Sequence, residues 1–180
     1  MQVDTTDIPG VLLIKPRVFR DPRGLFLETW QQQRFADAGI AGTFVQDNFS
    51  VSTRGTLRGL HYQIEQPQGK MVHVTRGRVF DVVVDLRRSS SAFGRHLAFE
   101  LDSEEHHQIW IPPGCAHGFL VLSDEADFSY RCTDYYLPSA ERTLLWNDPT
   151  LGISWPIEDE PLLSDKDRRG RRLADAETYP

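Results

Sequence analysis

Three side chains of this sequence could carry out proton chemistry together: His61, Lys70 and Tyr130. Histidine is the natural general base near neutral pH, a lysine ammonium stabilises an oxyanion as it forms, and a tyrosine can give or take a proton. This set suits removal of a proton from a carbon next to a carbonyl group, with the lysine steadying the enolate oxygen. Return of a proton to the opposite face of the carbon inverts that centre, which is epimerisation.

The lysines stand out because the chain otherwise uses arginine for positive charge. Of the 20 basic residues only Lys15, Lys70 and Lys166 are lysines, and the other 17 are arginines. A lysine in such a chain is therefore a candidate for a specific role, and Lys70 and Lys166 are the two that fall inside the motifs described below.

Short strands must position these side chains. Hydrophobic runs of strand length, punctuated by glycine and proline, follow one another without long helices between them, which predicts an antiparallel sandwich or small barrel. A short helix is predicted over residues 31–38, and the charged residues from about 168 onward are predicted to be less ordered. The strands are predicted over residues 11–14, 25–30, 71–75, 79–86, 96–101, 108–111, 118–122, 127–133 and 143–146.

The clearest predicted hairpin covers residues 71–86, with its turn at Arg76–Arg78. Its second strand alternates between an entirely apolar face and a face that carries Asp81 and Asp85. These aspartates either line a ligand cavity between two sheets or face solvent. The pattern alone favours neither alternative.

Composition bounds the class of protein. The 180 residues are 39% hydrophobic and 26% charged, which predicts one globular domain over residues 1–180 that needs no disulfide or structural metal to fold. The sequence has no apolar run of membrane-spanning length and no secretory signal, so we expect no membrane partner. The net charge of −6 argues against a nucleic-acid partner. The two cysteines predict a reduced, cytoplasmic protein, and Cys115 is interpreted as a small buried residue rather than a nucleophile.

Two segments, residues 55–77 and 111–117, resemble the two signature segments of the cupin superfamily of small β-barrels. The resemblance implies an all-β, cupin-type double-stranded β-helix (jelly-roll) barrel with short peripheral helices. His61 and His117 match two of the four metal-ligand positions of metal-binding cupins.

The other two ligand positions have changed. Gln63 stands at the second histidine and Lys70 at the glutamate, so one ligand has become a cation that would repel a divalent metal. We therefore expect a site without a metal. The adjacent His106 and His107 are predicted to lie on the surface.

A closer resemblance covers nearly the whole chain. The segments that carry it are VFRDPRGLFLE (18–28), FVQDNFSVS (44–52), LRGLHYQ (57–63), GKMVHVTRGRVFDVVVDLRRSS (69–90), FGRHLAFEL (93–101), WIPPGCAHGFLVLSD (110–124), YRCTDYYLPSAE (130–141), WNDPTLGISWP (146–156) and LSDKD (163–167). Through them the sequence resembles the dTDP-4-dehydrorhamnose 3,5-epimerases of dTDP-L-rhamnose biosynthesis. This resemblance implies epimerisation at C3 and C5 of dTDP-4-dehydro-6-deoxy-D-glucose, without a cofactor.

The resemblance implies catalytic roles at matching positions. His61 would be the general base, and Asp167 would orient it and balance its charge. Tyr130 would be the acid on the opposite face of the sugar, and Lys70 would stabilise the enolate. From strand alternation we also predict that Asp81 is the buried partner of Lys70.

Substrate-binding roles carry over in the same way. Arg58 would meet the pyrophosphate, and Tyr136 would stack on the thymine. Family members are homodimers whose N-terminal strands complete the partner's sheet, which implies that Arg23 and Glu28 serve the neighbouring subunit's pocket. The implied binding residues are Arg23, Glu28, Gln46, Asp47, Asn48, Arg58, His117, Tyr136, Glu141 and Lys166.

Other functions remain open at this point. The same groups could serve an enzyme that epimerises C3 or C5 alone, or a 3,4-ketoisomerase of a related deoxysugar pathway. A metal-dependent cupin is disfavoured by Gln63 and Lys70. A non-catalytic nucleotide-sugar-binding barrel is disfavoured because a binder needs no base set against an acid.

Overall fold

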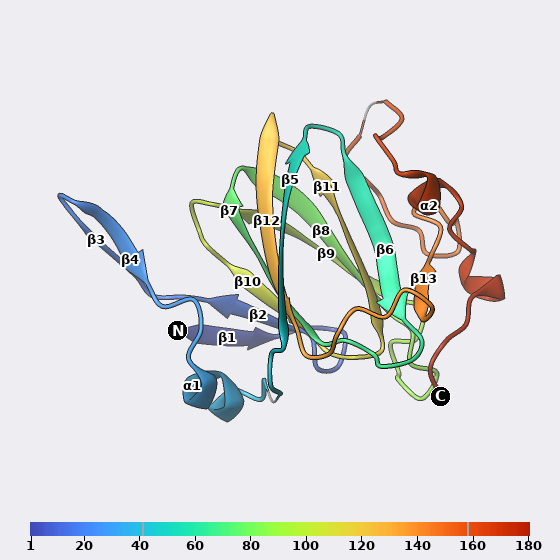
Figure 1. Ribbon diagram of the computed structural model, residues 1–180, viewed down its shortest axis with the longest axis horizontal. Coiled ribbons are helices and arrows are strands. Elements are labelled where there is room, and N and C mark those ends of the chain that lie inside the picture. The colour runs from blue at the N-terminus through green and yellow to red at the C-terminus, as the bar shows by residue number, and fades with distance from the viewer. Residues whose placement is uncertain (41, 158) are drawn as a thin grey trace.

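Two antiparallel sheets form the framework of the protein in the computed structural model, which describes residues 1–40, 42–157 and 159–180 (Figure 1). This is the predicted all-β barrel. The six-stranded sheet has the order β1 (Gln2–Thr5), β2 (Leu12–Lys15), β10 (Gln108–Ile111), β7 (Lys70–Arg76), β12 (Glu125–Cys132) and β5 (Gln46–Thr53). The five-stranded sheet has the order β13 (Glu141–Thr143), β6 (Leu57–Gln63), β11 (Cys115–Val121), β8 (Arg78–Asp85) and β9 (His96–Asp102).

Helical structure is peripheral. Helix α1 (Gln32–Asp37) confirms the predicted helix and packs its buried Phe35 onto the outer side of the six-stranded sheet, against Met71 and Trp110. Helix α2 (Asp165–Arg168) and a 3-10 turn (Leu173–Asp175) lie in the C-terminal segment. None of the helices in the described residues is long and apolar enough to cross a membrane.

The core between the sheets comes from the inward positions of both. Val72 and Phe128 from the six-stranded sheet meet Val83 and Phe119 from the five-stranded sheet, and all four are buried. The rings of Phe119 and Phe128 stack at a centroid distance of 4.1 Å. This core fills one part of the space between the sheets and leaves the remainder to the cavity described below.

The predicted hairpin over residues 71–86 is wrong. Strand β7 pairs with β10 and β12, whereas β8 pairs with β11 and β9, so the two segments belong to different sheets. Gly77 makes the crossing with a φ of +79°, and a Cβ there would lie 2.2 Å from the Glu125 carbonyl oxygen. Only glycine fits this corner without strain.

The two faces of β8 are both buried. Its apolar face packs under the C-terminal segment through Val82 and Val84, and its other face looks into the barrel. Asp81 and Asp85 are fully buried on the inward face, so they do not face solvent. Asp85 is bound there by Arg87, with Nη2 to Oδ2 at 2.7 Å.

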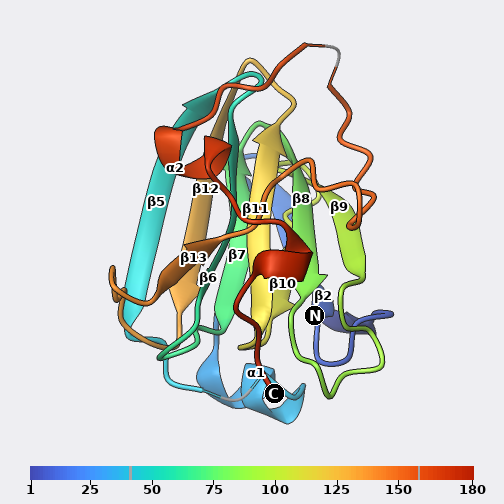
Figure 2. The same ribbon diagram turned by 90° about the vertical axis from the view of Figure 1, so that its right-hand side faces the viewer.

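The C-terminal segment lies against the five-stranded sheet, although the sequence predicts less order there. Isolated bridges join Leu144 to Arg171 and Arg87 to Tyr179, and the Tyr179 hydroxyl donates to the Gln63 carbonyl oxygen. Figure 2 shows this segment crossing that side of the barrel. Its apolar side chains supply the cover that the outer face of β8 requires.

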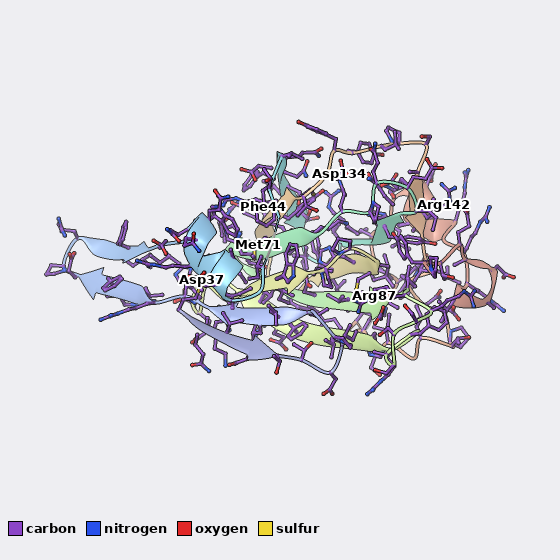
Figure 3. The ribbon with its side chains drawn as sticks, turned by 90° about the horizontal axis from the view of Figure 1, so that it is seen from below. Asp37, Phe44, Met71, Arg87, Asp134 and Arg142 are labelled. Atoms are coloured by element: carbon purple, nitrogen blue, oxygen red, sulfur yellow. The ribbon has the colours of Figure 1, made fainter. Side chains whose placement is uncertain are left out.

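One element leaves the barrel. Strands β3 (Val18–Asp21) and β4 (Gly24–Leu27) form a two-stranded hairpin that pairs with no other strand of the described chain and projects away from the sheets (Figures 1 and 3). Phe19 and Phe26 are register partners near its base, with ring centroids 6.4 Å apart, and Phe26 is 70% exposed.

Candidate active site

A cavity of about 630 Å³ opens between the two sheets, a size typical of small-molecule sites. Strands β5, β7 and β12 supply one wall, β6 and β11 supply the facing wall, and the segments around Glu141 and α2 contribute to the rim. Eleven of the fourteen predicted site residues line it: Gln46, Asn48, Arg58, His61, Lys70, His117, Tyr130, Tyr136, Glu141, Lys166 and Asp167.

His61 and Asp167 form a hydrogen-bonded pair, with His61 Nε2 2.5 Å from Asp167 Oδ1. Helix α2 begins at the N-cap Ser164, whose hydroxyl donates to Asp167 Oδ2 at 2.7 Å. The Gly59 amide also donates to Asp167, at 3.4 Å. The carboxylate therefore has donors on both oxygens and is fixed beside the imidazole.

This pairing determines the tautomer of His61. An ionised carboxylate can only accept hydrogen bonds, so Nε2 of His61 carries the proton and Nδ1 keeps a free lone pair. Burial lowers the pKa of His61 below its usual 6.5, against the opposing effect of Asp167. The ring is thus neutral at pH 7 and able to accept a proton.

The carboxylate remains ionised under the same conditions. Burial alone would raise the pKa of Asp167, but the hydrogen bonds from His61, Ser164 and Gly59 outweigh this effect and hold the pKa below its usual 3.8.

Close backbone contact places the two cavity histidines side by side. His61 on β6 and His117 on β11 are register partners. The strands approach closely at Gly59 and Gly118, where a Cβ on Gly59 would lie 2.7 Å from the Cα of Gly118. Larger residues at these two positions would push β6 and β11 apart and displace both imidazoles.

Tyr130 stands on the opposite wall from His61. It lies on β12 of the six-stranded sheet, whereas His61 lies on β6 of the five-stranded sheet, and both line the cavity. The Tyr130 ring packs at 6.2 Å from Phe128. Burial raises the pKa of Tyr130 above its usual 10, so its hydroxyl is protonated at neutral pH. A base and an acid therefore face each other across one cavity.

Lys70 enters the same cavity from β7 and is only 9% exposed. Burial lowers the pKa of Lys70 below its usual 10.5, and its ammonium forms neither a hydrogen bond nor an ion pair with any residue that the structure describes. A buried cation in this state gains strongly from an anionic oxygen placed beside it.

The predicted pairing of Lys70 with Asp81 is wrong. Asp81 Oδ2 instead lies 2.8 Å from His117 Nε2, and both groups are buried. The error follows from the hairpin prediction, because Lys70 and Asp81 belong to different sheets, whereas His117 lies on β11, directly beside β8. Asp81 Oδ1 has no hydrogen-bond partner among the described residues.

Three charged or polar side chains form a hydrogen-bonded network at the rim of the cavity. The Tyr136 hydroxyl donates to Glu141 Oε2 at 3.0 Å, and Lys166 Nζ donates to Glu141 Oε1 at 2.7 Å. Burial alone would raise the pKa of Glu141, but Lys166 outweighs it and the pKa is lowered. This network joins the loop before β13 to helix α2, which carries Asp167.

Three predicted binding residues lie away from the cavity of their own chain. Arg23 sits at the tip of the projecting hairpin, where its side chain is 90% exposed and pairs with Asp21. Glu28 pairs with Arg34, with Oε1 2.9 Å from Nη1. Asp47 points outward from β5, so it can reach a ligand in this cavity only through its main chain.

Sequence reasoning missed two hydrogen bonds that hold side chains of the cavity in place. Ser164 holds Asp167, and the spacing Ser-x-x-Asp at the start of a helix is a capping signal that the sequence does carry. The contact between His117 and Asp81 joins residues 36 positions apart, and only the sheet assignment reveals it.

Cys115 and His107 do not line the cavity. Burial raises the pKa of Cys115 to about 12, which fits a buried structural thiol. His107 is a partly exposed residue 3.8 Å from Glu105. Within residues 1–40, 42–157 and 159–180, no group of three or more His, Cys, Asp or Glu side chains could hold a metal ion.

A jelly-roll barrel with a neutral imidazole, a buried ammonium and an opposing phenol defines an isomerase-type proton-transfer site within the cupin-like fold. The family model for dTDP-4-dehydrorhamnose 3,5-epimerase matches residues 5–175. The chain belongs to this family of isomerases.

Known proteins of this family are similar to the chain over nearly its whole length. The dTDP-4-dehydrorhamnose 3,5-epimerase of Pseudomonas aeruginosa is 54% identical over 181 residues, covering 100% of both chains. The crystal structure of the Legionella pneumophila 3,5-epimerase RmlC, in complex with dTDP-4-keto-L-rhamnose, has a TM-score of 0.95 and 46% identity, covering 98% of this chain and 94% of that one. ChmJ, a 3′-monoepimerase from Streptomyces bikiniensis in complex with dTDP-quinovose, has a TM-score of 0.89 and 38% identity, covering 94% and 86%.

Proposed function

We propose that this chain epimerises C3 and C5 of dTDP-4-dehydro-6-deoxy-D-glucose to give dTDP-4-dehydro-L-rhamnose, a step of dTDP-L-rhamnose biosynthesis. Both carbons flank the 4-keto group, which makes their hydrogens removable. The observation that carries the proposal is the placement of the His61–Asp167 pair and Tyr130 on opposing sheets around one cavity.

The residues act in sequence at each carbon. His61 Nδ1 takes the proton, and the C–H electrons form the enolate double bond. The negative charge moves to the 4-oxygen, where the Lys70 ammonium stabilises it. Tyr130 then donates its hydroxyl proton to the carbon from the opposite face, which inverts the centre. His61 releases its extra proton to solvent, and the Tyr130 phenolate recovers one from solvent.

The rest of the cavity suits the nucleotide part of the substrate. Arg58 lines the cavity, and its Nε donates to Ser52 at 3.0 Å, which fixes the guanidinium for phosphate binding. Tyr136 offers a ring at the rim for stacking on the thymine. Gln46, Asn48 and His117 supply further polar contacts.

The reaction is tested by NMR of dTDP-4-dehydro-6-deoxy-D-glucose incubated with the protein in deuterated water. We expect deuterium at both C3 and C5, together with the L-rhamno product. Lack of exchange at both carbons would disprove the proposal, and tight dTDP binding without exchange would indicate a binding barrel instead.

Single epimerisation is the second candidate function. The similarity to the 3′-monoepimerase ChmJ supports it, because that protein shares the fold at 38% identity. The same NMR experiment discriminates the two functions, since a monoepimerase would yield a product inverted at one carbon only. A 3,4-ketoisomerase would instead move the carbonyl carbon signal.

The acid limb of the pH profile should report His61. Because the pKa of His61 is lowered, its base form is present at pH 7, and kcat/KM should fall only below the usual histidine range. In Asp167→Asn the carboxylate that raises this pKa is absent, so the limb should move to still lower pH. The plateau value of kcat/KM should fall by about 10²–10³-fold, because His61 is then a weaker base and its tautomer is no longer fixed. An unchanged profile and rate would contradict the role given to Asp167.

A homodimer would explain why Arg23 lies outside the cavity. In this arrangement the projecting β3–β4 hairpin reaches the neighbouring subunit and brings Arg23 to that subunit's cavity, with Glu28 at the base of the hairpin nearby. The exposed Phe19 and Phe26 support the proposal, because apolar rings on a hairpin that leaves its own barrel suit a protein contact.

Co-expression of Arg23→Ala and His61→Asn chains tests this arrangement. Mixed dimers would contain one site with an intact His61 and an intact Arg23 from the partner, so activity should exceed that of either variant alone. Each variant expressed by itself is the control. Failure of the mixture to exceed the Arg23→Ala protein would place Arg23 in its own chain's site or outside catalysis.

The proposed compartment is the cytoplasm. It is supported by two buried free thiols, Cys115 and Cys132, which are typical of a reducing environment.

A further inference from the structure

Both polar atoms of the Gln63 side chain form hydrogen bonds with the main chain of two neighbouring loops. Its Nε2 donates to the Gln66 carbonyl at 2.9 Å and to the Tyr135 carbonyl at 3.2 Å, and its Oε1 accepts from the Leu137 amide at 2.8 Å. The side chain is buried at the end of β6. Two of these bonds hold the main chain on the two sides of Tyr136.

Tyr136 is fixed at two further points. Its amide donates to Gln46 Oε1 at 2.9 Å, and its hydroxyl donates to Glu141 Oε2 at 3.0 Å. Nevertheless Tyr136 is 49% exposed, and its ring forms no aromatic pair with any ring that the structure describes. A ring restrained at its backbone and hydroxyl, with open space beside it, is prepared to receive a planar ligand.

The rest of the β12–β13 loop is anchored in the same manner. Gln68 Nε2 donates to the Asp134 carbonyl at 2.9 Å, and Thr133 Oγ1 accepts from the Gly69 amide at 2.8 Å. Figure 1 shows this loop passing the end of β6, and Figure 3 labels Asp134 within it. The Tyr135 amide also donates to Asp134 Oδ1, but among the described residues Gln63 is the one side chain that bonds to the main chain of both Tyr135 and Leu137.

We propose that Gln63 is a positioning residue that holds Tyr136 as the platform for the nucleobase and so sets affinity for the nucleotide part of the substrate. The inference rests on the proposed function, because it takes Tyr136 to stack on the base. Fixing the ring before binding lowers the entropy cost of closing it onto the ligand. The amide therefore acts through Tyr136 and touches neither C3 nor C5.

A double-mutant cycle with Gln63→Met and Tyr136→Ala tests this inference. Calorimetry would measure the Kd of dTDP and of inorganic pyrophosphate, and steady-state kinetics would separate KM from kcat. We expect Gln63→Met to weaken dTDP binding about tenfold and to raise KM similarly, with pyrophosphate binding and kcat changed less than about threefold. Gln33→Met, on the exposed face of α1, is the matched control and should behave as the wild type.

The cycle supplies the decisive comparison. In the Tyr136→Ala background, Gln63→Met should weaken dTDP binding by less than about twofold, because the platform is already absent. An equal loss in both backgrounds, or a loss of pyrophosphate affinity as large as that of dTDP, would overturn the inference. Gln63→Asn, which is polar but too short to reach the loop, should repeat the tenfold loss if the methionine variant does not fold, and wild-type affinity in it would overturn the inference.

Failure of the proposed function is distinguishable. If the wild type exchanges no deuterium at C3 or C5, the function is wrong, whatever the cycle gives. If exchange occurs but Tyr136→Ala binds dTDP as the wild type does, the reaction stands and the platform role of Tyr136, with that of Gln63, is wrong.

Discussion

Replacement of His61 by asparagine should reduce deuterium exchange at both C3 and C5 by at least about 10³-fold. Asparagine overlaps histidine only as far as Nδ1, so it lacks an atom at the Nε2 position that bonds to Asp167, and its amide cannot accept a proton at neutral pH. Both carbons should be affected equally, because the same imidazole serves both. The measurement is the rate of deuterium incorporation followed by NMR under single-turnover conditions.

The matched control is His96→Asn on β9, at the edge of the five-stranded sheet and outside the cavity lining. It should exchange as the wild type does. Retention of exchange at either carbon by the His61 variant, within about tenfold of the wild type, would mean that another group removes that proton and that the base is misassigned.

Replacement of Tyr130 by phenylalanine should separate exchange from inversion. The ring and its packing against Phe128 are kept, and only the hydroxyl is lost. His61 can still remove the proton and return a deuteron to the same face, so exchange at C3 should persist within about tenfold. Net inversion should fall about 10²–10³-fold, because the proton donor on the opposite face is gone.

This separation is read from one sample by comparing deuterium content with product stereochemistry. Tyr135→Phe is the control, since Tyr135 is an exposed tyrosine in the loop after β12 and does not line the cavity. Equal losses of exchange and inversion in the Tyr130 variant would argue that the tyrosine supports binding or the base rather than acting as the acid.

The sequence was sufficient for much of the fold, because strand alternation is a local property. The predicted strand 108–111 matches β10, and the two faces of residues 79–86 separate as the alternation requires. The sequence did not reveal which sheet each strand joins. A Gly corner between two extended segments resembles a hairpin turn, and the crossing at Gly77 becomes evident only when β12 lies against it.

The sequence also did not reveal that the C-terminal segment packs against the five-stranded sheet. The charged run beginning near Arg168 predicts exposure, yet Tyr179 and Leu173 bury apolar surface on the outer face of the five-stranded sheet. Nothing in the tail's composition identifies its partner, because the matching apolar face lies about 90 residues earlier.

For the site, family motifs identified the residues and the His61–Asp167 contact, but not the other contacts. Eleven predicted residues meet in one cavity, and these motifs carry them at positions far apart in the chain. The partner of Asp81 was mispredicted because pairing depends on sheet assignment. The role of Gln63 could not be inferred from its position among cupins, since its bonds go to a loop more than 70 residues away.

The central claim is that the base and the acid act from opposite faces of the sugar. The most direct measurement is a crystal structure of the protein with dTDP-4-dehydro-L-rhamnose or a non-epimerisable analogue in the cavity. We expect a hexose ring lying between the His61 imidazole and the Tyr130 hydroxyl, with the 4-oxygen beside Lys70. A hexose with both His61 and Tyr130 on one face, or with its 4-oxygen directed away from Lys70, would contradict it.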